Sequence, residues 1–475
     1  MRIFALDKRQ KMNKENTICA IATAPGGALG IIRVSGNKAI SITDKIFRPA
    51  GSDKRKLAER EAYTLTFGQI TDADGSIIDE VLVSIFRAPH SYTGEDSTEI
   101  SCHGSAYILQ RVMQLLIENG CGAAAPGEYT QRAFLNGKMD LSQAEAVADL
   151  IASHSAAAHR MAMNQMRGAF SKELSDLRAK LLHLTSLMEL ELDFSDHEEL
   201  EFADRSELVG VAERIRDVIS RLADSFRIGN AIKNGIPVAI VGETNAGKST
   251  LLNQLVGDER AIVSDIHGTT RDIIEDTIDI NGITFRFIDT AGIRDTTDKI
   301  ESIGIERTMK AIGKAETVLL IIDSTAAELQ TRELVPKVLP LCEGKTVIAV
   351  LNKSDLVEHD VCPTSLSASR NIKQIIKISA KTGDGIDILR QALCSSTDMA
   401  QTGNVTVSNI RHFNALKASL SDIERVYEGL TSGIPSDLVS EDLRSCLFHL
   451  GEITGGEIQT DEVLGNIFKH FCVGK

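Results

Sequence analysis

The chain has 475 residues, 43% of them hydrophobic and 25% charged, which is the composition of a globular protein of several domains. Its 52 Lys and Arg against 66 Asp and Glu give a net charge of −14, which excludes RNA binding by bulk positive charge, so we expect any RNA contact to be local or made by a partner. No apolar run reaches the length of a membrane span, and the eight cysteines form no CxxC pair, which favours a reducing cytoplasm.

The first part of the chain is predicted to be an α+β domain. We expect residues 1–13, MRIFALDKRQKMN, to be a disordered leader that lacks the apolar region of a secretory signal, with Met12 as an alternative start. Residues 14–138 then mix short β-like runs, such as GIIRVSG and EVLVSIF, with glycine turns such as DADG at 72–75.

Residues 139–234 and 397–475 are predicted to be helical. Apolar residues recur at helical spacing from 141 onward, and the acidic stretch DFSDHEELEFAD is expected to separate two helices. In the second stretch Asp437 and Asp461 are predicted N-caps and Gly455–Gly456 a helix stop. One helical domain that carries an inserted domain is favoured over three consecutive domains, because insertions succeed where domain termini lie close together.

Residues 235–396 alternate short buried strands with helices, which indicates a doubly wound α/β sheet. GETNAGKS at 242–249 follows the predicted strand IPVAIV and fits the phosphate loop GxxxxGK[ST]. Its glycines let backbone N–H groups surround phosphate oxygens. Lys248 is expected to reach the β- and γ-phosphates, and Ser249 to ligate Mg²⁺.

Three shorter motifs follow at the ends of predicted strands, where α/β sheets bind ligands. DTAG at 289–292 offers Asp289 for Mg²⁺ through water and the N–H of Gly292 for the γ-phosphate. NKSD at 352–355 offers Asp355, which can accept two hydrogen bonds from guanine where adenine provides no such pair. SAK at 379–381 can close over the base. The four motifs in order predict a GTPase.

GTTRD at 268–272 lies where the first switch of such a domain is expected. Thr270 is the natural second Mg²⁺ ligand once the γ-phosphate orders the loop. Thr269 has the open alternative of a solvated loop hydroxyl.

DTAGIR lacks a residue that Ras-like GTPases use. Ile293 stands where they carry the glutamine that orients the attacking water. Arg271 and Arg294 are candidates for an arginine finger in cis, although each could be a solvated arginine or an ion-pair partner. Glu301, where the next helix is predicted to begin, could orient water, and its alternative is a helix-start carboxylate favoured by the dipole.

A monovalent cation offers another way to supply the missing charge. Asn245 lies inside the phosphate loop, and its amide oxygen could hold such a cation. Backbone carbonyls around Ser264 and Ile266 could complete the shell.

Taken together, the motifs resemble one family along residues 16 to 475. The stretches SYTGEDSTEISCHG, FLNGKMDLSQAEAVADLI, GETNAGKS, DTAGIRDTTDKIESIGIER and the terminal FCVGK, in this order, are similar to those of the MnmE (TrmE) tRNA-modification GTPases.

The resemblance implies a multidomain α/β protein with three parts. They are an N-terminal α+β domain that binds a one-carbon tetrahydrofolate and holds a homodimer, a discontinuous helical-bundle domain, and an inserted Ras-like doubly wound P-loop GTPase domain, the G domain. The folate would be 5,10-methylenetetrahydrofolate or 5-formyltetrahydrofolate. The family works in a heterotetramer with the FAD-containing MnmG (GidA), without a membrane. It adds an aminomethyl or carboxymethylaminomethyl group to C5 of the wobble uridine of certain tRNAs. GTP and potassium pair the G domains and drive hydrolysis.

The resemblance also implies roles for individual residues. Asn245, Ser264, Ile266 and Thr269 would bind K⁺, and Ser249 and Thr270 would bind Mg²⁺. Glu301 would act through bridging water, and Arg271 would be a switch arginine needed for activity but not a finger. Contacts to GTP would come from Asn245, Ala246, Gly247, Lys248, Ser249, Thr250, Ser264, Asp265, Ile266, His267, Gly268, Thr269, Thr270, Asp289, Thr290, Ala291, Gly292, Asn352, Lys353, Asp355, Ser379, Ala380 and Lys381. His267 departs from the small residue expected before Gly268.

For folate, the residues that match are Arg33, Glu99, Lys138 and Lys475. A carboxylate suits the N–H donors of the pterin ring, and basic groups suit the glutamate tail. Each has the alternative of an ordinary surface ion pair. Cys472 is a candidate for the modification chemistry, with simple burial as its alternative.

Two other classes of function stay open on these residues. One is a GTP-dependent binding module such as a ribosome-assembly GTPase, although no basic appendage is present. Loss of wobble-uridine modification on deletion would separate it from the leading hypothesis. The other is a folate-binding protein with a decayed G domain, against which the intact motifs argue.

Overall fold

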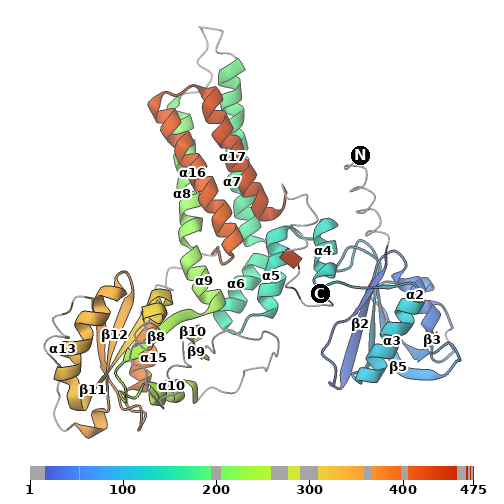
Figure 1. The fold of residues 1–475 in the computed structure, drawn as a ribbon. Coiled ribbons are helices and arrows are strands. Elements are labelled where there is room, and N and C mark those ends of the chain that lie inside the picture. The colour runs from blue at the N-terminus through green and yellow to red at the C-terminus, as the bar shows by residue number, and fades with distance from the viewer. Residues whose placement is uncertain are drawn as a thin grey trace. The chain divides into compact units, whose positions relative to one another are not determined.

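The computed structural model describes residues 16–52, 54–193, 205–257, 276–288, 309–357, 363, 366, 369, 371–396, 405–456, 467–468, 471 and 474. The chain divides into two compact units. The first comprises residues 1–148, 166–172 and 448–475, and the second comprises residues 149–165 and 173–447. Figure 1 shows the helices and strands of both.

The first unit is built on a seven-stranded sheet in the order β3-β4-β5-β6-β2-β1-β7. All neighbouring strands are antiparallel except β1 and β7. The strands are β1 (Ile18–Ile21), β2 (Leu29–Ser35), β3 (Phe47–Pro49), β4 (Leu65–Thr71), β5 (Ile77–Phe86), β6 (Ser97–His103) and β7 (Gly122–Ala123). The predicted DADG turn joins β4 to β5, where the N–H of Gly75 donates to the carbonyl of Asp72.

The helices of this unit's N-terminal part are α2 (Ala39–Ile46), η1 (Leu57–Glu59), α3 (Ala106–Glu118) and α4 (Glu128–Leu135). Helices α2 and α3 cover one face of the sheet. On the other face, Tyr129 of α4 packs against Ile18 and Ala20 of β1, while the part over β4 and β5 is open. Alternate strand residues such as Ile32 and Ile100 form a core with Ile40 of α2 and Val112 of α3. The intervening positions of β4 and β5 lie on the open face. Phe67 and Leu82, which pair across the two strands, remain 51% and 42% exposed there.

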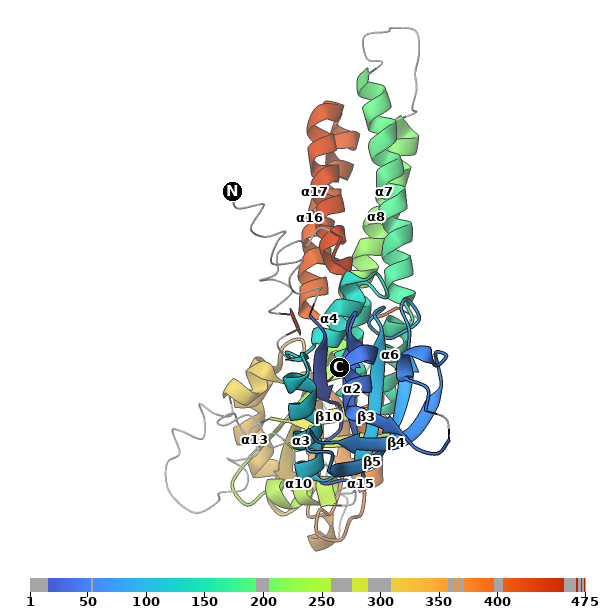
Figure 2. The same ribbon diagram turned by 90° about the vertical axis from the view of Figure 1, so that its right-hand side faces the viewer.

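Helices precede and follow the α/β domain in the chain. They are α5 (Leu141–Ile151), α6 (Ala156–Met166), α7 (Ala169–Asp193), α8 (Arg205–Asp224), α9 (Phe226–Asn234), α16 (Ile410–Ser432) and α17 (Ser436–Thr454). Figures 1 and 2 show α7, α8, α16 and α17 side by side as a bundle. The bundle therefore draws its helices from both sides of the α/β domain, as the predicted insertion requires.

The α/β domain is a six-stranded sheet in the order β13-β12-β11-β8-β10-β9, parallel except for β9. The strands are β8 (Ile236–Gly242), β9 (Asp276–Ile280), β10 (Ile283–Phe287), β11 (Thr317–Asp323), β12 (Thr346–Asn352) and β13 (Ile372–Lys377). The helices are α10 (Lys248–Gly257), η3 (Ser324–Ala326), α13 (Ala327–Val338), η4 (Leu339–Cys342), η5 (Ser354–Leu356) and α15 (Ile386–Ser395). All seven residues of β11 are buried, as expected for a parallel strand covered on both faces.

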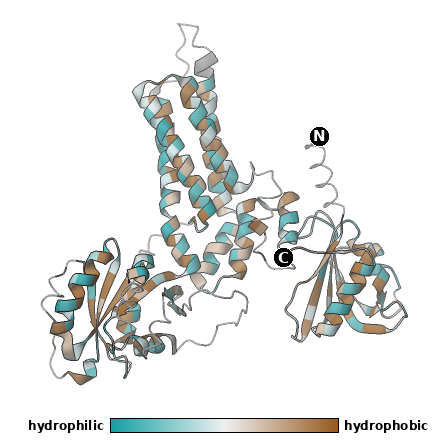
Figure 3. Cartoon of the chain, viewed as in Figure 1, coloured by the Kyte–Doolittle hydropathy of each residue, from teal (hydrophilic) through white to brown (hydrophobic). Residues whose placement is uncertain are grey.

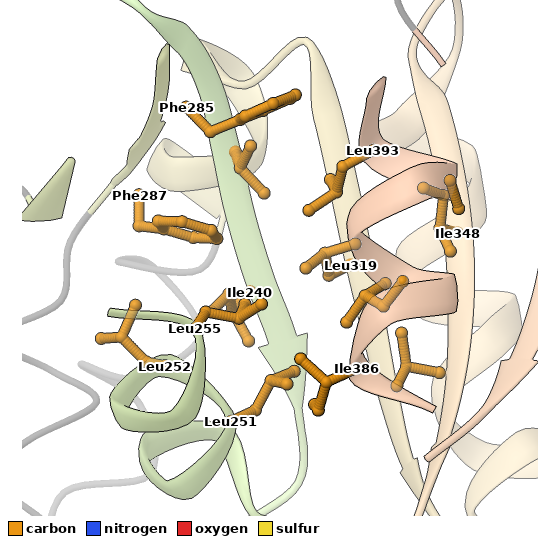
Figure 4. Packing of buried hydrophobic residues seen from close by; sticks show 14 of the residues in the cluster. Ile240, Leu251, Leu252, Leu255, Phe285, Phe287, Leu319, Ile348, Ile386 and Leu393 are labelled. Atoms are coloured by element: carbon orange, nitrogen blue, oxygen red, sulfur yellow. The ribbon is translucent and has the colours of Figure 1, made fainter. Parts of the chain in front are cut away.

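Each face of this sheet has its own core. On one face, Leu251 of α10 and Ile386 of α15 belong to one buried cluster with Ile240 and Phe285 of the strands (Figure 4). On the other face, Val335 of α13 belongs to a second hydrophobic cluster. The strands carry mainly hydrophobic residues (Figure 3), so the sheet is fixed between two helical layers.

The predicted fold class is confirmed, and one local prediction needs correction. Asp437 is not an N-cap but lies in the first turn of α17, because this helix already begins at Ser436. The helical stretch predicted from 141 onward begins with two helices, α5 and α6, separated by residues 152–155. Asp461 lies outside the described residues. The domain boundaries remain predictions.

The helix stop at Gly455–Gly456 is confirmed, since α17 ends at Thr454 and Gly455 takes a φ of 86°. Among the residues that the structure describes, no helix combines the length and the apolarity that a membrane span needs.

The chain returns from the α/β domain against α9. Val407 donates its N–H to the hydroxyl of Ser225 at 3.0 Å, and the rings of Phe226 and Phe413 stack at 4.5 Å. Gly229 faces the carbonyl of Val407 so closely that an added Cβ would clash with it. The segments that enter and leave the α/β domain therefore contact each other, and we call these contacts between α9 and the segment around Val407 the clamp.

This clamp predicts opposite effects for two glycine-to-alanine changes in helices. Gly229→Ala should lower the free energy of unfolding by about 1–3 kcal/mol, because the methyl group must displace the Val407 backbone. Gly210→Ala on α8, whose nearest neighbour would be the Arg214 guanidinium at 3.5 Å, should raise it by about 0.5–1 kcal/mol through helix propensity. Thermal and urea unfolding of both full-length variants would check this. Equal stabilisation by both would contradict the clamp.

Candidate nucleotide-binding site

Three of the predicted nucleotide motifs, GETNAGKS, NKSD and SAK, meet at one edge of the parallel sheet, and DTAG lies outside the described residues. In the register, Gly242 of β8 lies opposite Ile321 of β11, and Asp323 of β11 lies opposite Asn352 of β12. The carboxyl ends of these three neighbouring strands thus lie at the same edge, and each continues into a loop with polar residues. This is the edge where open α/β sheets bind ligands.

The phosphate loop connects β8 to α10. Asn245 and Gly247 both take left-handed backbone conformations, with φ of 64° and 92°. Gly247 is required, because a Cβ there would clash with the side-chain amide of Asn352. Ala246 between them is fully buried, whereas Asn245 is exposed. The loop leads directly into α10 at Lys248, so its N–H groups and the helix N-terminus can face an anion together.

The ammonium of Lys248 is held inside this loop. It donates to the carbonyls of Gly242 and Glu243, at 2.7 Å each. Burial lowers the pKa of Lys248 below its usual range, with Glu243 opposing the shift. A partly desolvated cation at this position gains more from a phosphate oxygen than a solvated lysine would.

Asn352 joins the phosphate loop to the loop after β13. Its side-chain N–H₂ donates to the carbonyl of Ala246 at 2.8 Å, and its side-chain oxygen accepts from the N–H of Ala380 at 2.9 Å. The residue is 2% exposed, so both bonds are shielded from water. The NKSD and SAK motifs, which were predicted separately, are therefore linked to the phosphate loop by the two hydrogen bonds of Asn352.

Lys353 also has a structural partner. It takes a left-handed conformation with φ of 64°, and its ammonium bonds the Asp323 carboxylate at 2.6 Å. Burial would raise the pKa of the Asp323 carboxyl, but the hydrogen bonds from Lys353 and Thr325 together lower it. This pair fixes the turn after β12, which leaves the Asp355 side chain exposed at the site edge.

The SAK loop is ordered by its own hydrogen bonds. Ser379 and Ala380 are buried, and Lys381 is exposed. The N–H of Ser379 donates to Asp384 at 2.9 Å, and the Ser379 hydroxyl accepts from the N–H of Thr382 at 3.2 Å. The loop is thus rigid enough to present its backbone to a base.

The described part of the chain contains about half of the predicted site. Present and converging are Asn245, Ala246, Gly247, Lys248, Ser249, Thr250, Asn352, Lys353, Asp355, Ser379, Ala380 and Lys381. Predicted site residues outside the described residues are Ser264, Asp265, Ile266, His267, Gly268, Thr269, Thr270, Arg271, Asp289, Thr290, Ala291, Gly292, Glu301, Cys472 and Lys475. The switch and metal assignments therefore stay predictions.

The folate candidates lie in the first unit. Arg33 of β2 and Glu99 of β6 face each other in the register and form an ion pair at 2.8 Å. The Arg33 guanidinium also donates to the carbonyl of Gly474 at 3.1 Å. Lys138 is exposed, and its ammonium donates to the carbonyl of Pro89 at 2.9 Å. The ion pair that was the alternative for Arg33 and Glu99 is thus present.

Sequence reasoning missed several residues that build these sites. Asp323 ends the run TVLLIID, and its place at a strand end could have marked it as a candidate. The bridging role of Asn352 has no sequence signal beyond the NKSD motif itself. Tyr92 and Tyr129, whose rings lie 5.7 Å from the Arg33 guanidinium, come from a loop and a helix distant in sequence.

Comparisons with known proteins cover nearly the whole chain. The family model of the MnmE helical domain matches residues 141–472, and that of the GTP-binding protein TrmE N-terminus matches residues 17–138. A "tRNA modification GTPase MnmE" of Bacteroides thetaiotaomicron is 60% identical over 468 residues, which is 97% of this chain and 100% of the relative. One of Bacteroides fragilis is 61% identical over 467 residues, and one of Flavobacterium johnsoniae is 48% identical over 472, with coverage of 97% and 98% of this chain and 100% of each relative.

The bridge made by Asn352 predicts a coupled loss of stability and affinity. Asn352→Ala leaves the Ala246 carbonyl and the Ala380 N–H buried without their partner. We expect GDP affinity, measured with a fluorescent analogue, to fall at least about tenfold, since each unpaired group costs about 1–3 kcal/mol. Asn164→Ala, on the exposed face of α6, is the matched control and should leave affinity unchanged. Wild-type affinity of Asn352→Ala would contradict the bridge.

The lowered pKa of Lys248 predicts a pH dependence. Phosphate binding favours the charged ammonium, so nucleotide affinity should fall as pH rises through the lowered pKa, earlier on the alkaline side than for an ordinary lysine. Titrations of GDP from neutral to alkaline pH at constant ionic strength measure this. Affinity that stays flat until the usual lysine range would show that burial does not tune this group.

Proposed function

The chain belongs to the MnmE family of tRNA modification GTPases, and from this membership we propose that it is a potassium-activated GTPase that modifies the wobble uridine of tRNA. As a member it is a GTP hydrolase. We propose that its G domains pair when GTP and K⁺ are bound. We also propose that it acts as a homodimer in the cytoplasm, in a heterotetramer with the FAD-containing MnmG.

The observation that carries the nucleotide part is the contact of the phosphate loop with both base loops at Asn352. Phosphate ligands and base ligands are thereby fixed in one frame. Asp355 leaves its carboxylate exposed beside that frame, where it could accept from guanine N1–H and N2–H₂. Adenine offers no such pair of donors, so this arrangement supports a preference for GTP.

The metal assignments rest on donor chemistry at the phosphate loop. Ser249, in the first turn of α10, offers a hydroxyl oxygen, which suits Mg²⁺, and Thr270 would supply a second. Asn245 carries a neutral amide oxygen on an exposed left-handed residue, which suits a monovalent cation, with Ser264, Ile266 and Thr269 as further ligands. A cation there supplies positive charge beside the phosphates.

The protein's own residues would then orient the attacking water. Ile293 cannot do so, because it has no polar atom. We assign that work to Glu301 through bridging water, with Arg271 needed for the active switch conformation. Both assignments rest on the family resemblance.

The N-terminal unit supports the folate and dimer parts of the proposal. The open face of its sheet carries Arg33 and Glu99 beside exposed Leu65, Phe67 and Leu82. An exposed apolar face of this kind suits a second copy of the chain. Lys138 and Lys475 would bind the anionic tail of 5,10-methylenetetrahydrofolate or 5-formyltetrahydrofolate. Its carbon would extend C5 of the uridine, with Cys472 as the candidate residue for that chemistry.

Potassium dependence is the decisive test of the GTPase mechanism. GTP turnover in KCl should exceed that in NaCl at equal ionic strength by at least about tenfold, because the cation replaces an arginine finger, which is worth about 10³–10⁵ in rate. Asn245→Ala should abolish the difference while GTP affinity stays within about threefold. Asn164→Ala should keep the full stimulation.

Equal turnover in the two salts would overturn the cation mechanism. Arg271, Arg294 or a separate activating protein would then have to supply the charge. Stimulation that survives Asn245→Ala would place the cation elsewhere in the G domain.

A further inference from the structure

The loop of residues 88–96 joins the predicted folate residues to one another. The carbonyl of Pro89 accepts from Lys138 at 2.9 Å, and the carbonyl of Thr93 accepts from the side-chain amide of Asn136 at 2.8 Å. Between these two contacts, Tyr92 places its ring 5.7 Å from the guanidinium of Arg33. The loop thus lies between the two basic candidates of the site.

Glu95 fixes this loop to the scaffold. Its carboxylate accepts from one guanidinium nitrogen of Arg132 on α4, at 3.1 and 3.2 Å, and from the hydroxyl of Ser35 on β2 at 2.8 Å. The side chains of Arg132 and Glu95 are only 8% and 15% exposed. A largely buried, multiply bonded ion pair of this kind holds the loop in one conformation.

Tyr92 has an orientation that is unusual for a surface tyrosine. Such residues ordinarily lay the ring on the protein and keep the hydroxyl in water. Here the hydroxyl bonds Thr130, which is fully buried, at 2.9 Å, while 38% of Tyr92 stays exposed. The hydroxyl of Tyr92 is thus bonded inside the protein while the residue stays partly exposed, and the Thr130 bond restrains the orientation of the ring.

Arg33 is already engaged by the protein. Its Nε and Nη2 atoms donate to Glu99 at 2.9 and 2.8 Å, its Nη1 donates to the Gly474 carbonyl, and its guanidinium lies 5.7 Å from the centre of the Tyr129 ring. Its charge is matched by Glu99. Lys138, by contrast, is exposed, and its ammonium has three donors, one of which bonds the Pro89 carbonyl.

We propose that Tyr92 is a ring-stacking residue of the folate site that is proposed above around Arg33, Glu99 and Lys138. The inference rests on the proposed folate function and adds a recognition element to it. A planar heteroaromatic ring gains from a pre-oriented aromatic partner, because no rotamer freedom is lost on binding. The class of ligand that fits is a planar ring joined to a carboxylate tail, as in a reduced folate.

The test is calorimetric binding of 5-formyltetrahydrofolate to the full-length protein and three variants. Tyr92→Leu should weaken binding about tenfold, and Tyr92→Phe should stay within about threefold, because stacking needs the ring and not the hydroxyl. Tyr107→Leu, which removes a 70% exposed tyrosine of α3, is the matched control and should bind like wild type. GTP turnover of all three should equal wild type, which verifies their folding.

A second readout is optical. The chain has five tyrosines and no tryptophan, so bound pterin should quench a larger share of tyrosine emission in wild type than in Tyr92→Leu. Equal binding by wild type and Tyr92→Leu would overturn the stacking role and leave the folate function standing. Equal losses in Tyr92→Leu and Tyr92→Phe would assign the effect to the Thr130 bond instead. A wild-type protein that binds no folate would overturn both proposals.

Discussion

Asn352 makes the contact on which the rest of the nucleotide site depends. A single buried amide donates to the phosphate loop and accepts from the loop after β13. Gly247 must lack a side chain because this amide occupies the space that a Cβ would fill. One side chain therefore sets the distance between the groups that would hold phosphate and those that would hold the base. Its burial keeps water from competing for either bond.

At the same edge of the sheet, the register of the parallel strands brings polar residues from different strands close together. β11 and β12 end level with each other at Asp323 and Asn352, and β8 ends at the same edge with Gly242 opposite Ile321. Asp323 then binds Lys353 and orders the turn that leaves Asp355 exposed. The ion pair and the amide bridge position this edge, and Lys248 and Asp355 are the groups that we propose contact the nucleotide.

The N-terminal unit is built differently, on a mainly antiparallel sheet whose second face is left open over β4 and β5. Helices α2 and α3 bury the alternate residues of the strands on one side. The other side keeps an apolar area next to the Arg33–Glu99 pair, and Tyr92 is held over that pair by a loop anchored through Glu95. A sheet face that is left open can serve a ligand and a partner at once, because both need exposed surface on a rigid base.

The sequence by itself determined the α/β order, the phosphate loop and the family. These features are local, since a glycine-rich loop between a strand and a helix, or a buried run of seven residues, is written in neighbouring residues. It also placed Arg33, Glu99 and Lys138 in one domain. Only the tertiary structure decided that Arg33 is paired with Glu99, that the Tyr92 ring lies beside Arg33, and that Asn352 bridges two motifs. These outcomes depend on hydrogen bonds between residues that are 28 to 106 positions apart and that meet only after folding. They also depend on which polar groups remain exposed once the others have found hydrogen-bond partners. Which polar groups become buried and paired depends on how the side chains pack, and this packing cannot be read from neighbouring residues in the sequence.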